Sequence, residues 1–286
     1  MDKKLALRIA PITADELYID EHVVVALENA TKQIITHGAY INAEGEDVYI
    51  EDEQEFARAN TIVYTPHHVI PSARPKYPES YGFVHNQTTL TVAHERHKLG
   101  YRVVLINCST VTDTLTTSPQ VYPESILRSS SLLYCLEGGP FDSDALDEFR
   151  DDTIVVTPQV PIFRNHEGNL LRSPWHADIV TAAPVHALDV QQYAPSRAAE
   201  IAVAMARRAQ RLVDAAAATA ANVLVVGAWG CGVHGNDAEL VATVLRVACE
   251  RPAARAFAIV DVAVADTDPA TPLYLTFAKH FQEKKF

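Results

Sequence analysis

Glycine is scarce in this chain of 286 residues and gathers at one place. Only 11 glycines occur, and four of them lie close together, at Gly227, Gly230, Gly232 and Gly235. Glycine permits backbone conformations and close approaches that a side chain prevents, so this cluster predicts a loop that needs such freedom. Free backbone N–H groups in a loop of this kind can bind an anion such as a phosphate.

The residues on either side of the loop predict the elements that hold it. Residues 223–226 form a continuous apolar run, which is typical of a strand buried on both faces. Residues 238–249 carry apolar side chains at helical spacing, with Asn236 and Asp237 as the two candidate N-caps. A strand, a glycine loop and a helix N-terminus in this order direct N–H groups and the positive end of the helix dipole to one point, where a phosphate would bind. A tight turn without a ligand is the alternative.

Strand and helix patterns alternate along the rest of the chain. Strand patterns occupy residues 102–108, 153–156, 178–181 and 257–264. Helix patterns occupy residues 124–136, 196–221 and 273–285, and Ser196 is the expected N-cap of the second. This alternation is typical of an α/β fold in which a sheet lies between two layers of helices.

The first part of the chain has a different pattern. Residues 15–36 predict an amphipathic helix, an acidic segment follows over residues 44–55, and prolines are frequent between residues 66 and 78. We therefore expect an N-terminal helical extension with a loop-rich bridge over residues 1–84. The main α/β domain is expected over residues 85–286.

Charge and composition exclude several classes of protein. The formal net charge is −12, and a field of that sign disfavours general binding to nucleic acids. No apolar run is long enough to span a membrane, and the N-terminus lacks the apolar length of a secretory signal. Three arginines of the 196–221 helix, Arg207, Arg208 and Arg211, are expected to form a solvated helix face rather than a binding patch.

The four cysteines predict neither a metal site nor a disulfide framework. Cys108, Cys135, Cys231 and Cys249 are too far apart in sequence for a zinc-binding pair. Free thiols are typical of a reducing compartment, so the cytoplasm is the expected location. No metal and no cofactor are expected.

Five segments, in order along the chain, resemble one known family. They are residues 88–90 (TTL), 105–107 (LIN), 124–136 (ESILRSSSLLYCL), 157–164 (TPQVPIFR) and 224–237 (LVVGAWGCGVHGND). Together they resemble the microbial-type poly(ADP-ribose) glycohydrolases, a branch of the macrodomain fold with an N-terminal helical extension. The resemblance implies a three-layer α/β/α macrodomain-like sandwich with a mixed sheet.

The same resemblance implies an ADP-ribose cleft at the carboxyl edge of the sheet. The ligand-binding residues that it implies are Asn107 at a strand end and Gly230, Cys231, Gly232, Val233, His234, Gly235 and Asn236 in the loop. His234 stands where the family usually has an aromatic residue, and it is either a ligand contact or an exposed loop histidine. Asn107 is either a ribose contact or a turn residue. Cys231 is expected to line the loop without acting as a nucleophile, because no neighbour in the sequence would activate its thiol.

The family's catalytic motif is kept only in part. The family has a glycine triplet followed by Gln-Glu-Glu, and the aligned residues here are Tyr122, Pro123 and Glu124. Glu124 matches the family's catalytic acid, while the glycine triplet has no counterpart in residues 108–123. A single carboxylic acid can protonate the departing oxygen of a ribosyl bond and then activate water. The alternative is that Glu124 is an ordinary first-turn carboxylate favoured by the helix dipole.

These observations lead to one expected function and two alternatives. The expected function is a hydrolase that cleaves the ribosyl O-glycosidic bond of ADP-ribose conjugates, with Glu124 as acid and base. The main alternative is a catalytically weak or inactive module that binds ADP-ribose or a related nucleotide. A third is a changed nucleotide ligand recognised by the Thr-rich segment before Glu124. ADP-ribose or an ADP-ribosylated substrate is the expected partner, and the oligomeric state is not predicted.

Overall fold

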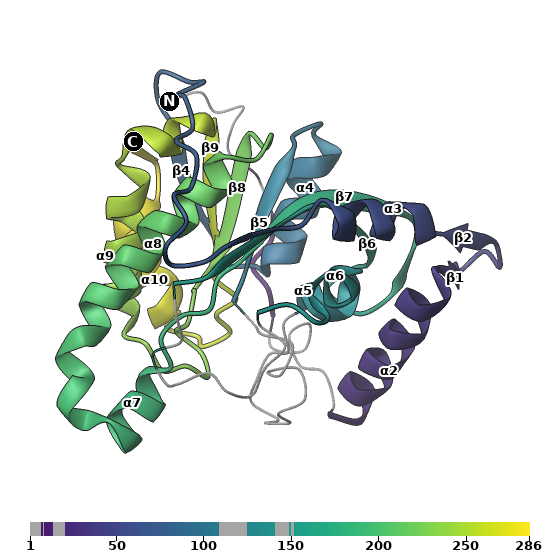
Figure 1. Ribbon diagram of the computed structural model, residues 1–286, viewed down its shortest axis with the longest axis horizontal. Helices are drawn as coiled ribbons and strands as arrows, with labels where there is room; N and C mark the ends of the chain where they lie inside the picture. The colour runs from purple at the N-terminus through teal and green to yellow at the C-terminus, as the bar shows by residue number, and fades with distance from the viewer. Residues whose placement is uncertain (1–6, 8, 14–20, 109–124, 141–148, 150–151) are drawn as a thin grey trace.

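A mixed sheet forms the centre of the protein. The computed structural model describes residues 7, 9–13, 21–108, 125–140, 149 and 152–286 (Figure 1). Within these residues the main sheet has eight strands in the order β10-β4-β9-β8-β5-β7-β6-β3. Its strands are β3 (Ile62–Tyr64), β4 (Tyr81–His85), β5 (Val103–Asn107), β6 (Ile154–Arg164), β7 (Leu170–Thr181), β8 (Val223–Gly227), β9 (Ile259–Ala263) and β10 (Lys284–Lys285). The five strands from β4 to β7 in this order are parallel, whereas β6, β3 and β10 are antiparallel to their neighbours.

Helices cover both faces of this sheet (Figure 1). One face packs against α8 (Ile201–Ala217), α9 (Ala238–Cys249) and α10 (Pro272–Phe281). The other packs against α3 (Glu51–Ala59), α4 (Thr89–Lys98), α5 (Ser125–Ser129) and α6 (Leu132–Leu136). Along β5, Val104 and Ile106 join the first core while Val103 and Leu105 join the second, as the period of two in a strand requires. The expected three-layer α/β/α fold is confirmed.

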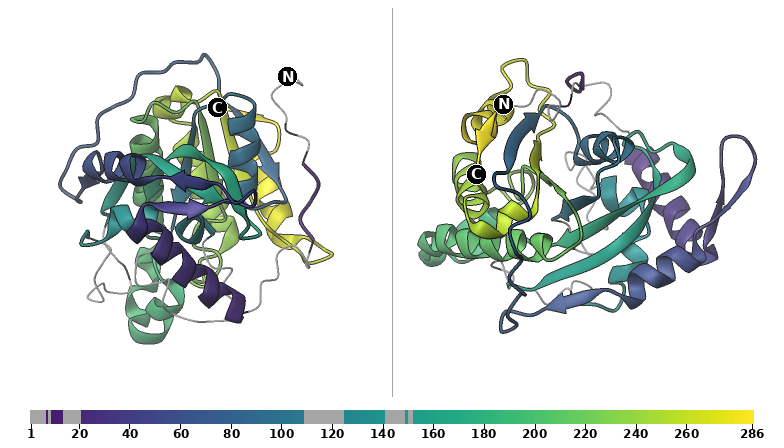
Figure 2. Two further views of the ribbon diagram at one scale, coloured as in Figure 1. Left: turned by 90° about the vertical axis from the view of Figure 1, so that its right-hand side faces the viewer. Right: turned by 90° about the horizontal axis from the view of Figure 1, so that it is seen from above.

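The N-terminal part packs on the far end of the β6–β7 hairpin. Helix α2 (Glu21–His37) and the small sheet of β1 (Ala39–Ile41) and β2 (Asp47–Tyr49) form a separate core with Phe163 of β6. In the right-hand view of Figure 2 the purple α2 lies on the opposite side of the molecule from the yellow-green helices. Strand β3 precedes residue 85 but pairs with β6 in the main sheet. The division into residues 1–84 and 85–286 stays a prediction.

Three predicted helices end or begin at other residues than expected. The pattern from Ser196 begins as a 3-10 helix, Pro195–Glu200, and only then continues as α8, so Ser196 is not its N-cap. The terminal helix ends at Phe281, and residues 284–285 pair with β4 instead. The 124–136 pattern is divided into α5 and α6, because Ser130 leaves the helix to bridge Ile162 and its hydroxyl donates to the carbonyl of Ile126.

The predicted solvated arginine face is also wrong in part. Arg208 is 1% exposed, and its guanidinium donates to Asp152 and to the carbonyl of Ala183. Arg211 donates to the carbonyls of Thr65 and His68 in the Pro-rich segment, so α8 fastens that segment to the domain. Periodicity placed these side chains on one helix face, but it could not show that distant chain segments cover that face.

Within the described residues, no helix is both long and apolar enough to cross a membrane.

Candidate ligand-binding site

Three parallel strands end together at one edge of the sheet. Strand β5 lies between β7 and β8, and it ends at Asn107 directly beside Thr181, the last residue of β7. Strand β8 ends at Gly227 on the other side of β5, and the glycine loop follows it. Ligands of open α/β sheets bind outside the carboxyl ends of the strands, so this edge is the candidate site.

The glycine loop consists of two successive turns. The N–H of Cys231 donates to the carbonyl of Ala228 at 2.9 Å, and the N–H of Gly235 donates to that of Gly232 at 2.9 Å. Gly230 stands at the third position of the first turn with φ of 78°, where a type II turn requires a positive φ. A Cβ on Gly230 would also lie 2.6 Å from Cβ of Pro184, so neither the conformation nor the space admits a side chain.

Two buried side chains, those of Trp229 and Asn236, hold this loop by hydrogen bonds. The indole N–H of Trp229 donates to the carbonyl of Ala182 at 2.8 Å. The amide Nδ2 of Asn236 donates to the carbonyls of Val185 and Gly230, at 2.7 and 3.0 Å. Both therefore tie the loop to the segment that follows β7. Asn236 is 5% exposed and serves here as a support, and a direct ligand contact from it stays a prediction.

The tip of the loop presents its backbone to solvent. Val233 is 39% exposed, and a Cβ on Gly232 would meet no atom within 4 Å. The N–H groups of Gly232 and Val233 donate to no group among the residues described. Of the two candidate caps of α9, Asp237 is the one used, since its carboxylate accepts from the N–H of Leu240 at 2.8 Å. The tip thus offers free amide donors to an anion.

Cys231 lies in the loop as a lining residue. Burial, assisted by the negative charge of Asp237, raises the pKa of the Cys231 thiol to about 12. The thiolate that a nucleophile requires is therefore almost absent near neutral pH. All four cysteines of the chain are free thiols.

His234 is not an exposed loop histidine. It is 5% exposed, and its ring packs edge-to-face on His186 with centroids 5.0 Å apart. His186 lies at the start of α7 (Ala187–Tyr193), where its Nδ1 accepts from the N–H of Asp189. The carbonyl of His234 also accepts from the N–H of Leu188, so a hydrogen bond and a ring contact join the loop to α7. A ligand contact from His234 stays a prediction.

Asn107 joins two strand ends. Its side chain is fully buried, and its amide Nδ2 donates to the hydroxyl of Thr181 at 3.2 Å. Its carbonyl accepts from the N–H of Ala182, the first residue after β7. Asn107 therefore fixes the position from which residues 182–185 approach the glycine loop, while a contact to ribose stays a prediction.

The predicted catalytic residue falls outside the described part of the chain. Glu124 and residues 109–123, which replace the family's glycine triplet, are not described, and α5 begins at the next residue, Ser125. Among the residues that are described, no three His, Cys, Asp or Glu side chains lie close enough together to hold a metal ion.

Sequence reasoning missed the residues that support the loop. Trp229, Pro184 and His186 contact or hold it, and Thr181 accepts from Asn107 at the adjoining strand end; none of the four was a candidate. Trp229 carried the clearest signal, since a large aromatic residue between glycines has to pack somewhere. The other three come from a segment distant in sequence, and no local pattern could connect them with the loop.

Comparisons with known proteins agree with this picture. The family model described as "Microbial-type PARG, catalytic domain" matches residues 28–165. The structure is similar to poly(ADP-ribose) glycohydrolase from Thermomonospora curvata, with a TM-score of 0.77 and 27% identity over 91% of this chain and 100% of that one. A structure of that enzyme with the inhibitor ADP-HPD matches with a TM-score of 0.76 and 28% identity, again over 91% of this chain and 100% of that one. No curated protein matches the sequence.

A second bacterial enzyme gives a similar result. Poly(ADP-ribose) glycohydrolase from Deinococcus radiodurans in complex with ADP-ribose matches with a TM-score of 0.72 and 27% identity, over 79% of this chain and 96% of that one. The family model and the similar structures come from separate comparisons, and both point to poly(ADP-ribose) glycohydrolases. In the sequence of residues 28–165 and in fold, this chain is similar to the microbial-type poly(ADP-ribose) glycohydrolases.

Proposed function

We propose that this protein hydrolyses the ribosyl O-glycosidic bond of ADP-ribose conjugates, with Glu124 as the acid and base. One observation carries the proposal above all: a glycine loop lies at the carboxyl edge of the sheet, and two of its amides, those of Gly232 and Val233, donate to no group in the described part of the chain. Relatives with the same fold have structures with ADP-ribose and with ADP-HPD. The substrate would be an ADP-ribosylated protein or other ADP-ribose conjugate.

The loop suits a pyrophosphate for physical reasons. Backbone amides donate to phosphate oxygens at short range, so the loop can hold a pyrophosphate locally although the protein's net charge is −12. Trp229 and Asn236 hold the loop before a ligand arrives, and an ordered loop loses little conformational entropy on binding. Asn107 and His234 would contact the ribose groups on either side.

The proposed chemistry needs one carboxyl group and water. Glu124, protonated, donates its proton to the departing oxygen while the bond from that oxygen to the ribose carbon breaks. The resulting carboxylate then takes a proton from water, whose oxygen adds to the same ribose carbon. The products are ADP-ribose and the acceptor with a free hydroxyl group, so atoms and charge balance.

A binding module without catalysis is the second candidate. It is favoured by the sequence between Asn107 and Glu124, which contains no glycine and places Tyr122 and Pro123 where the family has Gln and Glu. Proline removes a backbone N–H donor, and β-branched threonines prevent the close backbone approach that glycines allow.

Turnover and binding measured together separate the two candidates. The protein and its Glu124→Gln variant are incubated with poly- and mono-ADP-ribosylated protein, and released ADP-ribose is quantified. For a hydrolase we expect the variant to lose about 100-fold or more in rate, because general acid catalysis contributes at least that much. Equal turnover by both proteins, with ADP-ribose binding retained in calorimetry, would support the binding module. Absence of ADP-ribose binding at millimolar concentration would contradict both.

The location is a further part of the proposal. None of the four cysteines forms a disulfide, and thiols persist in a reducing compartment. We therefore place the protein in the cytoplasm.

A further inference from the structure

The second turn of the glycine loop, residues 232–235, is in contact with a helix from a distant part of the chain. Three contacts join this turn to the start of α7. The N–H of Leu188 donates to the carbonyl of His234 at 3.2 Å. The side chain of Leu188 packs on the backbone of Gly235, and the ring of His186 packs edge-to-face on that of His234. A hydrogen bond, an apolar contact and a ring contact therefore meet at one turn.

The contact between Leu188 and Gly235 fixes the backbone of this turn. Gly235 has φ of 66°, and a Cβ there would lie 2.3 Å from Cγ of Leu188 and 2.8 Å from its Cδ2. Glycine is the residue that allows so close an approach. The N–H of Gly235 donates to the carbonyl of Gly232 at 2.9 Å and closes the turn. The amides of Gly232 and Val233 belong to this closed turn, so their direction depends on where Leu188 holds Gly235.

The ring of His186 is held by the helix that follows it. Its Nδ1 accepts from the N–H of Asp189 at 3.3 Å, which makes His186 the N-cap of α7. The carboxylate of Asp189 lies 3.1 Å from the same nitrogen and would accept a hydrogen bond from it if the ring were charged. In both protonation states the ring is thus tied to Asp189. The rings of His186 and His234 lie 5.0 Å apart between centroids at 64°, a geometry that aromatic pairs prefer.

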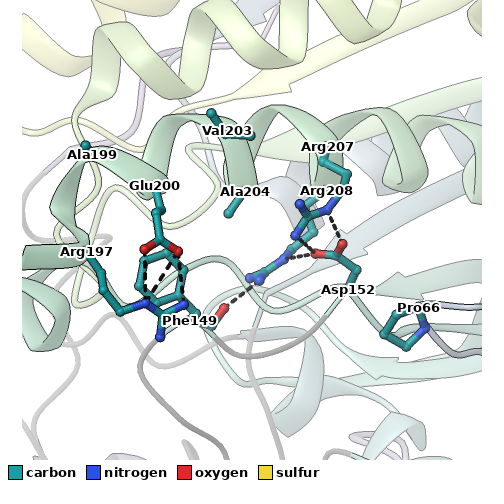
Figure 3. Close-up of a pocket in the computed structure, with 10 residues that line it drawn as sticks. All are labelled: Pro66, Phe149, Asp152, Arg197, Ala199, Glu200, Val203, Ala204, Arg207 and Arg208. Atoms are coloured by element: carbon teal, nitrogen blue, oxygen red, sulfur yellow. Dashed lines mark hydrogen bonds and ion pairs between the residues drawn. The ribbon is translucent and has the colours of Figure 1, made fainter. Parts of the chain in front are cut away.

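The base of α7 is fixed to the body of the protein. Val190 is fully buried in the core that α8 covers. The segment before α7 is held by Arg208 of α8, whose Nη1 donates to the carbonyl of Ala183 at 2.8 Å. In Figure 3, Arg208 reaches from α8 to the carboxylate of Asp152, which accepts from its Nε at 3.1 Å. Side chains supported in this way can hold a neighbouring loop in one conformation.

We propose that the start of α7 positions the amide donors of the loop tip for a pyrophosphate, with His186 and Leu188 as positioning residues. They act through His234 and Gly235 and need no contact with the ligand themselves. This rests on the proposed function. A loop that is already held in its binding conformation loses less conformational entropy when the ligand binds, so the support increases affinity.

The test separates the ring of His186 from its cap. His186→Asn removes the ring but keeps a residue that caps helices well, whereas His186→Phe keeps a ring and removes the cap. The matched control is His37→Asn, at an exposed histidine of α2 whose Nδ1 also hydrogen-bonds to the backbone of its own helix. The measurements are the melting temperature, the affinities for ADP-ribose and inorganic pyrophosphate by calorimetry, and kcat and KM for release of ADP-ribose.

We expect His186→Asn to weaken both affinities about fivefold, which corresponds to the loss of one aromatic pair. KM should rise by a similar factor while kcat stays within about twofold, because the lost interaction serves binding and not the chemical step. His186→Phe should keep both affinities within about twofold, although its melting temperature falls with the loss of the cap. His37→Asn should change neither affinity.

Hydrogen exchange shows directly whether the loop is held. The N–H groups of Gly235 and Leu188 are hydrogen-bonded within the contact. Both should exchange faster in His186→Asn than in the unsubstituted protein, while the amides of β8 keep their rates. Leu188→Ala should act in the same direction on exchange and affinity. Its control is Leu275→Ala, at a leucine of α10 that is 55% exposed against 50% for Leu188, and it should change neither.

A double-mutant cycle tests whether His186 acts through His234. In a His234→Ala background the ring that His186 positions is absent. His186→Asn should then change pyrophosphate affinity by less than about twofold, so the two substitutions are not additive.

Each other outcome has a definite meaning. A greater loss of affinity in His186→Phe than in His186→Asn would make His186 a helix cap only and overturn the proposal. Weaker ADP-ribose binding with unchanged pyrophosphate binding would place the effect on the ribose and overturn the assignment to the tip amides. A full effect of His186→Asn in the His234→Ala background would also overturn it. Absence of ADP-ribose binding by the unsubstituted protein would instead refute the proposed function, while exchange at Gly235 still shows whether α7 holds the loop.

Discussion

Arg96 of α4 and Asp261 of β9 form a bidentate ion pair in the interior of the protein. Nε of Arg96 lies 2.6 Å from Oδ2 of Asp261 and Nη2 lies 2.8 Å from Oδ1, and both side chains are fully buried. Nε2 of His85 lies 2.9 Å from the same Oδ1. Burial acts to raise the pKa of Asp261, but the hydrogen bonds from Arg96 and His85 lower it overall. The pair fastens α4 to the sheet.

Arg96→Met should therefore destabilise the protein severely. The substitution leaves the Asp261 carboxylate buried without its guanidinium, and breaking one partner of a buried pair costs about 3–5 kcal/mol in free energy of unfolding. Urea unfolding followed by circular dichroism measures the loss. The control is Lys98→Met on the same helix, at an exposed position, where we expect a change within about 0.5 kcal/mol. Similar losses in both variants would mean that the buried pair does not stabilise the fold.

Gly230→Ala should damage the loop, whereas Gly232→Ala should leave it folded. Alanine at position 230 needs a positive φ and places its Cβ against Pro184, so we expect a loss of about 1–3 kcal/mol in stability. At position 232 the new Cβ meets no atom within 4 Å. Thermal unfolding of both variants and calorimetry with ADP-ribose are the measurements. A lower melting temperature for Gly232→Ala than for Gly230→Ala would contradict this account of the loop.

Cys231 should be chemically inert in the folded protein. Since burial raises the pKa of its thiol to about 12, iodoacetamide at pH 8 should modify Cys231 far more slowly in native protein than in urea, as peptide mapping by mass spectrometry would show. Cys231→Ala should keep ADP-ribose release within about twofold of the unsubstituted protein, because Cys231 is not a nucleophile. Substitution of a nucleophile would instead remove most of the activity. Rapid labelling combined with loss of turnover would make Cys231 a catalytic residue.

Acidification should destabilise the protein through two histidines on Trp175. His94 stacks on the indole at 5.2 Å between centroids and His97 lies against it at 5.2 Å. Burial lowers the pKa of both histidines, with a smaller contribution from Lys98 for His94 and from His176 for His97. The unfolded chain therefore binds protons first as the pH falls below about 6.5, so stability decreases below that pH.

Urea unfolding at pH 7.5 and at pH 5.5 tests this dependence. The His94→Gln, His97→Gln double variant should lose less stability between the two pH values than the unsubstituted protein. A His67→Gln variant, in the exposed Pro-rich segment, serves as the control and should show the unsubstituted pH dependence. If all three proteins lose the same amount, the titrating groups lie elsewhere.

The sequence alone determined the strand, loop and helix that carry the candidate site. The apolar run of β8, the glycines of the loop and the spacing along α9 are local patterns, and local geometry suffices to interpret them. The sequence predicted an N-cap of α9 at residue 236 or 237, and only the structure showed that Asp237 is the residue used. The three-layer fold followed from the alternation of strands and helices, for the same local reason.

Only the tertiary structure decided which distant segments meet. Asn107 joins Thr181, His234 packs on His186, and Arg208 is buried where its helix pattern predicted a solvated face. Each of these outcomes depends on a partner from another part of the chain, and a pattern of period 2 or 3.6 contains no information about that partner. Side-chain periodicity reports which face of an element turns inward, whereas the identity of the neighbour on that face is set by how the whole chain packs.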